Sequence, residues 1–227
     1  MNKLLLSTMA YSVLAFGTQA NDTGIRILAG EKRIDTLQSV DMRGAEIFGT
    51  YNIQKADSVG GIFARGEMRF LNGLEHGLDM RDNRFMIETG ISRQIVDGAI
   101  LSVSPLGLIY ETAEMRNIFN TLSEKRWFYA PSISYKHTIG GFSVKVDASY
   151  RISLSNKVNY ATVSGDVYNK GTATGYDIGV EAMYSLNKNI DVFVSWSREN
   201  LNVPGDGTYT AYDQAQHYLG AGIGYTF

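Results

Sequence analysis

The segment FSVKVDASYRIS, residues Phe142–Ser153, determines the fold class. Apolar residues stand at every second position, beginning with Phe142 and Val144, and small, polar or charged residues stand between them. Successive side chains of a β-strand point to opposite faces. A period of two over this length therefore predicts a strand with one apolar and one polar face.

The same alternation recurs along the rest of the chain. Pro105 and Pro131 interrupt two of the segments, and because proline has no amide hydrogen to donate, we expect a bulge or an edge at each. About ten strands are predicted, within a range of roughly eight to twelve. The other segments are Gly24–Glu31, Ala45–Ile53, Ile62–Phe70, Phe85–Gln94, Ala99–Tyr110, Trp127–Lys136, Gly175–Leu186, Ile190–Ser197 and Tyr218–Phe227.

Composition excludes several classes of protein. The 227 residues are 44% hydrophobic and carry a formal charge of −2, which excludes a disordered chain. Lys and Arg number 21 against 23 Asp and Glu, so no basic excess exists to bind a nucleic acid. There is no cysteine, which excludes disulfides and cysteine metal sites. The 24 glycines, 14 tyrosines and 10 phenylalanines are typical of strands and turns.

Residues 1–20 have the pattern of a cleaved secretory signal peptide. Lys3 supplies a positive charge, residues 4–16 form an apolar run, and small residues precede a cleavage site after Ala20. The run is shorter than the about 20 residues that a transmembrane helix needs. We therefore expect a mature chain of residues 21–227, exported to the periplasm or outer membrane of a Gram-negative cell.

Alternating strands occur in secreted sandwiches as well as in membrane barrels, and the connections favour a barrel. Short and long connections take turns, as periplasmic turns and extracellular loops do in membrane barrels. The sequence predicts an all-β protein, a closed antiparallel up-and-down transmembrane β-barrel; a secreted sandwich remains the alternative. The short connections are Gln54–Val59, Ile95–Gly98, Thr138–Gly141 and Asn187–Asn189, and the longest loop is Leu154–Thr174.

Aromatic residues lie at the ends of the apolar faces. Two such rings would border an aliphatic band, because the eight residues from Tyr176 to Tyr184 span roughly 20 Å of membrane depth. The predicted aromatic girdle consists of Tyr51, Trp127, Tyr135, Phe142, Tyr150, Tyr176, Tyr184, Trp196 and Tyr225.

The polar faces would line a narrow lumen. Ten tilted strands enclose a backbone diameter of roughly 20 Å, which excludes a wide porin. The charges could form a transverse field that selects small polar solutes, or a paired network that closes the barrel. The predicted lumen charges are Arg65, Glu67, Arg69, Glu88, Lys145, Asp147, Arg151, Asp177, Glu181 and Asp191, with Arg65 and Arg69 facing Asp177 and Glu181.

The final segment, His217–Phe227, resembles the C-terminal signal of Gram-negative outer-membrane proteins. The resemblance implies that the barrel-assembly machinery recognises this strand through Leu219, Ile223, Tyr225 and Phe227. With the signal peptide and the repeated hairpins, the whole chain resembles the small outer-membrane barrels of the OmpA, OmpX and opacity type. Its strand number resembles the omptin barrel, and its short-turn hairpins resemble the oligogalacturonate porins.

The loops support a second hypothesis, surface recognition of a host or other ligand. Apolar residues at helical spacing in Thr112–Lys125 predict a short amphipathic helix. Asn202–Asp213 contains a turn followed by tyrosines suited to adhesive contact. Arg126 and Arg198 adjoin tryptophans, where they could meet lipopolysaccharide phosphates. The helical positions are Met115, Ile118, Phe119 and Leu122, and the tyrosines are Tyr209 and Tyr212.

A catalytic function is not expected. An omptin-like protease needs an acidic pair facing an Asp–His pair. His137 adjoins a short turn, and His76, near Asp79 and Asp82, is predicted in an external loop without the matching partners. No metal site or cofactor is implied. The sequence predicts a non-enzymatic outer-membrane barrel that contacts lipid and lipopolysaccharide, either a narrow channel or structural barrel or, alternatively, an adhesin.

Overall fold

The structure is a computed structural model that describes residues 20–34, 39–54, 61–75, 77–116, 121–161, 168–169, 172–205 and 211–226. Nearly all of these residues are in strands. The strands are β1 (Ala20–Ile34), β2 (Val40–Gln54), β3 (Gly61–Glu75), β4 (Leu78–Val96), β5 (Ala99–Arg116), β6 (Thr121–Tyr129), β7 (Ser132–Ile139), β8 (Phe142–Ala161), β9 (Tyr168–Asn169), β10 (Thr174–Ser185), β11 (Ile190–Val203) and β12 (Tyr212–Tyr225).

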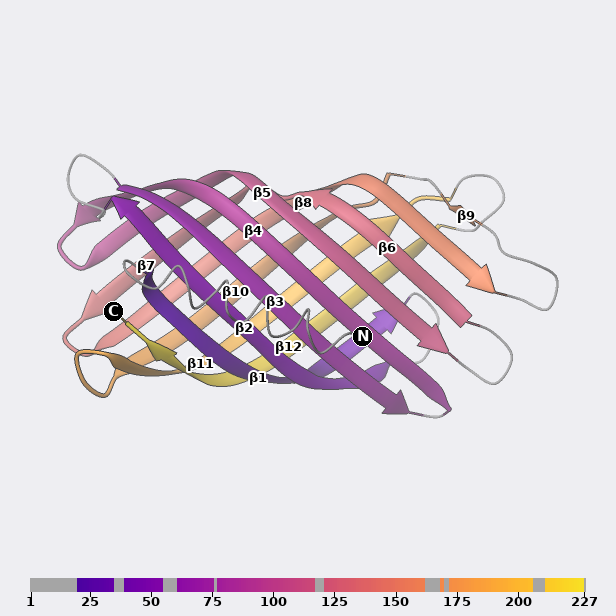
Figure 1. Ribbon diagram of the computed structural model, residues 1–227, viewed down its shortest axis with the longest axis horizontal. Coiled ribbons are helices and arrows are strands. Elements are labelled where there is room, and N and C mark those ends of the chain that lie inside the picture. Colours follow the sequence, from indigo (N-terminus) through magenta and orange to yellow (C-terminus); the bar gives the residue numbers. More distant parts are fainter. Residues whose placement is uncertain are drawn as a thin grey trace.

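The strands form a closed antiparallel barrel (Figure 1). Each strand from β1 to β5 pairs with the next, β11 pairs with β10 and β12, and β12 returns to β1. The strands β6 and β7 share one position between β5 and β8, and β8 pairs with β10 to complete the ring. Because β9 pairs only with β8, the ring has ten positions, as the sequence predicted.

Both prolines in the predicted strands mark irregularities in the ladder. Ala130 and Pro131 separate β6 from β7, so the predicted strand Trp127–Lys136 is two strands in one position. Pro105 lies in β5 where the register against β4 shifts between Thr89 and Ile91. A bulge here leaves proline outside the regular hydrogen-bonded ladder.

Tight turns connect neighbouring strands at one end of the barrel. Asp97 and Gly98 connect β4 to β5, and Gly140 and Gly141 connect β7 to β8. Gly98 has φ +73° and Gly140 has φ +60°, values that side-chain-bearing residues rarely adopt and that two-residue hairpins require. We call this the short-turn end.

At the opposite end, the strands run much further than predicted. The pairing of β3 with β4 continues to Glu75 and Leu78, and β8 extends to Ala161, so most of the predicted loop residues after Phe70 and Leu154 are strand. Strands of 18 to 20 residues, such as β5 and β8, exceed the about 9–11 that cross a bilayer. We call this the extended end.

The extension removes the predicted helix. Met115 belongs to β5, and the residues of Thr112–Lys125 that the structure describes are in β5 and β6. Ile118 and Phe119 lie outside the described residues, as do the His76, Tyr209 and Phe227 of the sequence predictions and the signal peptide before Ala20. No helix long and apolar enough to cross a membrane occurs in the described part of the chain.

The outer surface carries an apolar band near the short-turn end. Aliphatic side chains such as Val146, Val180 and Val194 point outward and are exposed. The register aligns Tyr150 with Tyr176 at one border and Phe142 with Tyr184 at the other. Of the predicted girdle residues, Tyr51 is partly buried and the others are exposed on this surface. An exposed apolar belt of this kind is typical of a lipid-facing barrel.

The interior differs between the two ends. Toward the extended end, inward side chains form an apolar core. The sequence analysis did not predict this core. On β2, for example, Val40 and Met42 are buried while Asp41 and Arg43 are exposed. The barrel is therefore filled inside and hydrophilic outside at its extended end. Other core members are Leu28, Leu71, Met80, Ile109, Phe128, Leu201 and Val203.

Candidate functional site: the barrel lumen

The predicted lumen charges point into the barrel. Arg69 and Arg151 are almost fully buried, and Asp191 lines a cavity near the short-turn end. Nine of these ten residues make ion pairs, and Asp191 accepts a hydrogen bond from Thr226 at 3.2 Å. The nine are Arg65, Glu67, Arg69, Glu88, Lys145, Asp147, Arg151, Asp177 and Glu181.

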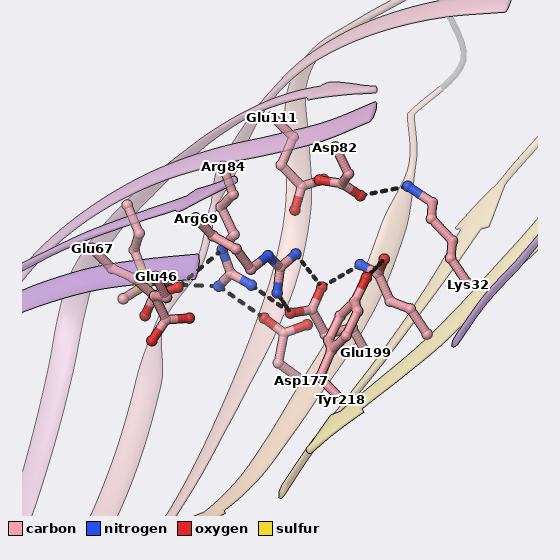
Figure 2. A network of polar contacts seen from close by, with 12 residues as sticks. Lys32, Glu46, Glu67, Arg69, Asp82, Arg84, Glu111, Asp177, Glu199 and Tyr218 are labelled. Carbon is pink, nitrogen blue, oxygen red and sulfur yellow. Dashed lines mark hydrogen bonds and ion pairs between the residues drawn. The ribbon is translucent and has the colours of Figure 1, made fainter. Parts of the chain in front are cut away.

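Three arginines from different strands converge on two carboxylates in the middle of the lumen (Figure 2). Arg69 of β3 binds Glu199 of β11 through both terminal guanidinium nitrogens, Nη1 and Nη2. The hydrogen bond from Nη2 measures 3.1 Å. Arg84 of β4 donates to Glu199 at 2.7 Å, and Arg151 of β8 donates to Asp177 of β10 at 2.6 Å. We call these five residues the central network. It joins strands on opposite sides of the barrel, so it obstructs the lumen.

Neighbouring groups add contacts to the central network, although Nε of Arg69, Nε of Arg84 and Oδ1 of Asp177 are buried without a hydrogen-bond partner among the described residues. Gln216 donates to Glu199 and accepts from the hydroxyl of Tyr218 at 2.7 Å. The Tyr218 ring lies 5.0 Å from the guanidinium carbon of Arg69, and Arg151 also pairs with Glu111. Buried charges with this many partners are held in place, because releasing one charge would leave its partners unpaired.

The predicted pairing across the lumen is partly correct. Asp177 faces the arginines, but its cross-lumen partner is Arg84, at 3.4 Å, and Arg69 meets Glu199 instead. Glu181 pairs with Arg26 of β1 and not with Arg69. Arg65 pairs along its own side of the barrel with Glu67 at 3.6 Å and Glu88 at 3.7 Å.

A second buried cluster lies toward the extended end. Arg126 of β6 donates to Glu124 at 2.7 Å, to Asn156 at 2.9 Å and to the Tyr212 hydroxyl at 2.6 Å. The amide of Gln214 donates to Glu124 at 2.9 Å. The prediction of Arg126 at the lipopolysaccharide surface is therefore wrong, and Tyr212 is buried rather than presented for adhesion. Arg198, in contrast, is exposed on the outer surface.

A buried ion pair shows that part of the predicted external loop around His76 is strand. Asp82 is buried in β4 and accepts from Lys32 of β1 at 2.6 Å (Figure 2). Asp79 is on β4 as well, 3.9 Å from Arg81. Asp82 is thus already neutralised within the lumen, where it cannot serve a surface catalytic site.

The space inside the barrel narrows from the short-turn end toward the extended end. A cavity of about 420 Å³ occupies the short-turn end, and we call it the vestibule. Beside the central network the cavity is only about 90 Å³. Among the described residues around Lys32, Met80 and Glu124, no space for a water molecule is left.

The sequence does not predict several of the lumen residues, because they lie beyond the predicted ends of the strands. Glu199 follows Ser197 at the same parity, and Arg84 and Asp82 precede Phe85. Carrying each alternation a few residues further would have found them. The other missed polar residues are Lys32, Glu111, Glu124, Asn156, Gln214 and Gln216, whereas Glu46 lies on the polar face of the predicted strand Ala45–Ile53 but was not among the predicted lumen charges.

The remaining histidines face outward. His217 lies 4.0 Å from Glu31 on the outer surface, and His137 stacks beside Tyr135 near the short turns. Among the described residues, no group of three or more His, Asp or Glu is arranged to hold a metal ion.

Neither a protein-family model nor a curated protein matches the chain. Among solved structures, it is similar to the translocator domain of autotransporter NalP from Neisseria meningitidis, with 10% identity, a TM-score of 0.52, and coverage of 98% of this chain and 95% of that one. The β-domain of the Bordetella autotransporter BrkA has 13% identity and a TM-score of 0.48 over 91% of this chain and 100% of that one. The attachment invasion locus protein Ail of Yersinia pestis has 11% identity and a TM-score of 0.34 over 91% and 99%.

These solved structures are outer-membrane β-barrels. The likeness to the NalP domain supports the barrel fold and carries no information about activity, because so few residues are identical. The predicted resemblance is supported at the level of outer-membrane barrels and not at the level of one subfamily.

Proposed function

We propose that the chain is an exported, non-enzymatic outer-membrane barrel whose lumen is closed to solutes. The sequence left two hypotheses for the lumen charges, a transverse field that selects solutes and a paired network that closes the barrel. The central network favours the second. Arg69 and Arg84 reach from β3 and β4 to Glu199 on β11, so the network bridges the barrel at its middle. The apolar core and the Arg126 cluster fill the space beyond it.

Planar-bilayer conductance tests this proposal. The purified wild-type barrel is expected to give no resolvable current in 1 M salt, whereas a double substitution of Arg69→Ala with Arg84→Ala removes two bulky side chains and is expected to give brief openings. Steady single-channel currents from the wild-type protein would contradict the closed lumen. The heat-dependent shift of each protein on a denaturing gel serves as the check that the barrel is folded.

The absence of catalysis is part of the proposal. The two acids near His76 in the sequence are engaged elsewhere, since Asp82 binds Lys32 and Asp79 lies 3.9 Å from Arg81. Hydrolysis of a basic peptide library by the purified protein, lost in His76→Ala, would overturn it.

A second candidate function is recognition at the cell surface. The observation that favours it is the length of the strands: β8 continues from Tyr150, at the border of the apolar band, to Ala161. Eleven strand residues at about 3.3 Å each reach well beyond a bilayer even when tilted. Binding of fluorescent barrels to epithelial cells or matrix proteins, lost when β5 and β6, and β8 and β10, are joined by shorter hairpins, would support this candidate; equal binding would remove it.

We further propose that the outer surface binds lipopolysaccharide. Lys125 of β6 and Lys157 of β8 are directly opposed in the ladder, and both are exposed. Lys125 stands two residues beyond the exposed Trp127, at the border of the apolar band. Like charges side by side repel, and an anionic headgroup between them would relieve this. Assembly by the barrel-assembly machinery through β12 is proposed from the resemblance of that strand.

A further inference from the structure

The vestibule at the short-turn end has the size and the lining of a binding site. Its volume of about 420 Å³ falls within the roughly 300–1,000 Å³ of small-molecule sites. Its inner side borders the smaller cavity beside the central network, and the two cavities share lining residues such as Arg65 and Lys145. A ligand site in the vestibule goes beyond the proposed function, because a closed lumen does not by itself require an accessible cavity at the short-turn end.

One wall of the vestibule is basic. Lys136 of β7 is directly opposed to Lys145 of β8 in the ladder, and both side chains line the cavity. Lys145 has Asp147 at 3.7 Å, but Lys136 makes no hydrogen bond or ion pair with any described residue. The next row holds Ser102 and Ser134, also opposed and also lining the cavity. An unpaired ammonium beside hydroxyl donors is suited to a carboxylate.

The facing wall carries the carboxylates of Asp22 and Asp191, and its cation Arg26 is paired with Glu46 and Glu181. Asp22 of β1 lines the vestibule, and its buried Oδ1 has no hydrogen-bond partner among the described residues. In the ring of ten positions, β1 and β7 are five positions apart in either direction, so Asp22 faces Lys136 across the lumen. Asp191 of β11 lies on the same side as Asp22 and accepts a hydrogen bond from Thr226 at 3.2 Å. A buried carboxylate oxygen without a donor is suited to an ammonium group.

Apolar side chains line the cavity between the two walls. Phe63 of β3 and Met183 of β10 line the cavity, and so do Phe48 and Phe193, whose rings meet at 5.4 Å. The guanidinium carbon of Arg26 lies 5.3 Å and 5.1 Å from these two rings, which fixes them in place. Such surfaces bury small apolar side chains of a ligand.

We propose that the vestibule binds a short zwitterionic peptide, with its ammonium group at Asp22 and its carboxylate at Lys136. The free width of a ten-strand lumen is about 6–10 Å, which two or three extended residues at about 3.3 Å each would span. The peptide enters from the short-turn end, which faces the periplasm if the short connections are periplasmic turns as in other membrane barrels. The ligand class is defined by its two opposite charges and their separation.

Calorimetric titration of the purified, detergent-solubilised protein tests the proposal with three probes. Trialanine has both charges, N-acetyl-trialanine lacks the ammonium, and trialanine amide lacks the carboxylate. Trialanine is expected to bind at least about tenfold more tightly than either blocked peptide, because each loses a charge-assisted hydrogen bond. Equal affinities for all three probes, or no saturable heat for trialanine up to about 10 mM, would overturn the proposal.

Substitutions assign each end of the ligand to its wall. Lys136→Gln is expected to bring the affinity for trialanine down to that of trialanine amide, and Asp22→Asn to that of N-acetyl-trialanine. Lys125→Gln, on the outer surface, is the matched control and is expected to leave all three affinities unchanged. If Lys136→Gln and Asp22→Asn bind trialanine as the wild type does, the assignment is wrong. Conductance is measured separately, so a leaky barrel that binds peptides contradicts only the closed lumen.

Discussion

Arg69 of β3 holds Glu199 of β11 across the lumen, and Arg84 of β4 binds the same carboxylate at 2.7 Å. One acidic side chain thus connects two neighbouring strands to the opposite side of the barrel. Hydrogen bonds along the ladder join only adjacent strands, so this contact braces the barrel in a direction that the ladder does not.

Removing the shared carboxylate is expected to destabilise the barrel strongly. Glu199→Ala leaves Arg69 and Arg84 buried without that partner, and breaking a buried pair in this way costs about 3–5 kcal/mol. The measurement is the free energy of unfolding in urea from lipid vesicles. Glu114→Ala, which removes an exposed partner of Arg116, is the control and should change little. A loss for Glu199→Ala as small as for the control would contradict the bracing role.

A conservative change at the same position separates charge from shape. Glu199→Gln keeps the volume and one acceptor oxygen but removes the negative charge between two guanidinium groups. We expect it to be less destabilising than Glu199→Ala, because the amide still accepts one hydrogen bond. Equal losses of unfolding free energy for the two variants would show that the charge alone matters.

The apolar band predicts where a charge is not tolerated. Val146 points outward, is 42% exposed, and lies midway between Phe142 and Tyr150 on β8. Val146→Arg is expected to lower the free energy of unfolding by about 2–4 kcal/mol in lipid. Leu74→Arg is the control, since Leu74 is 77% exposed near the tip of the β3–β4 hairpin, opposite Asp79. The band is misplaced if the two variants lose the same amount.

Much of the fold could be predicted from the sequence because lipid imposes a simple contrast. Within the apolar band, outward residues such as Val144 and Val146 are apolar and inward residues such as Lys145 are polar. The alternation is strict there, and the ten positions and the inward parity of Arg69 follow from it.

Beyond the band, the contrast reverses. On β11, Leu201 and Val203 are buried inside while Asn202 between them is exposed on the outer surface. A prediction that relies on one continuous apolar face ends the strand where the apolar residues move to the other face. The predicted strand Ile190–Ser197 therefore stops before Glu199. The long-range partners were also out of reach, because parity places a side chain inside but does not say which strand it meets.

The lysine pair at the outer surface predicts a lipid dependence. Replacing Lys125 and Lys157 together by Gln should slow folding into vesicles that contain lipopolysaccharide, since about 1 kcal/mol of attraction per lysine is lost. Folding into vesicles of neutral lipid should be unaffected. The rates are read from the change in gel mobility between boiled and unboiled samples, and equal slowing in both lipids would exclude a headgroup contact.

The closed lumen that we propose has a consequence for the membrane that would contain it. Each open pore added to a bilayer increases its leak of ions and nutrients, which limits how many copies a cell can tolerate. A barrel sealed by Arg69, Arg84 and Glu199 adds no such leak. Its abundance would be limited by membrane area alone, so it could cover a cell densely without cost to the permeability barrier.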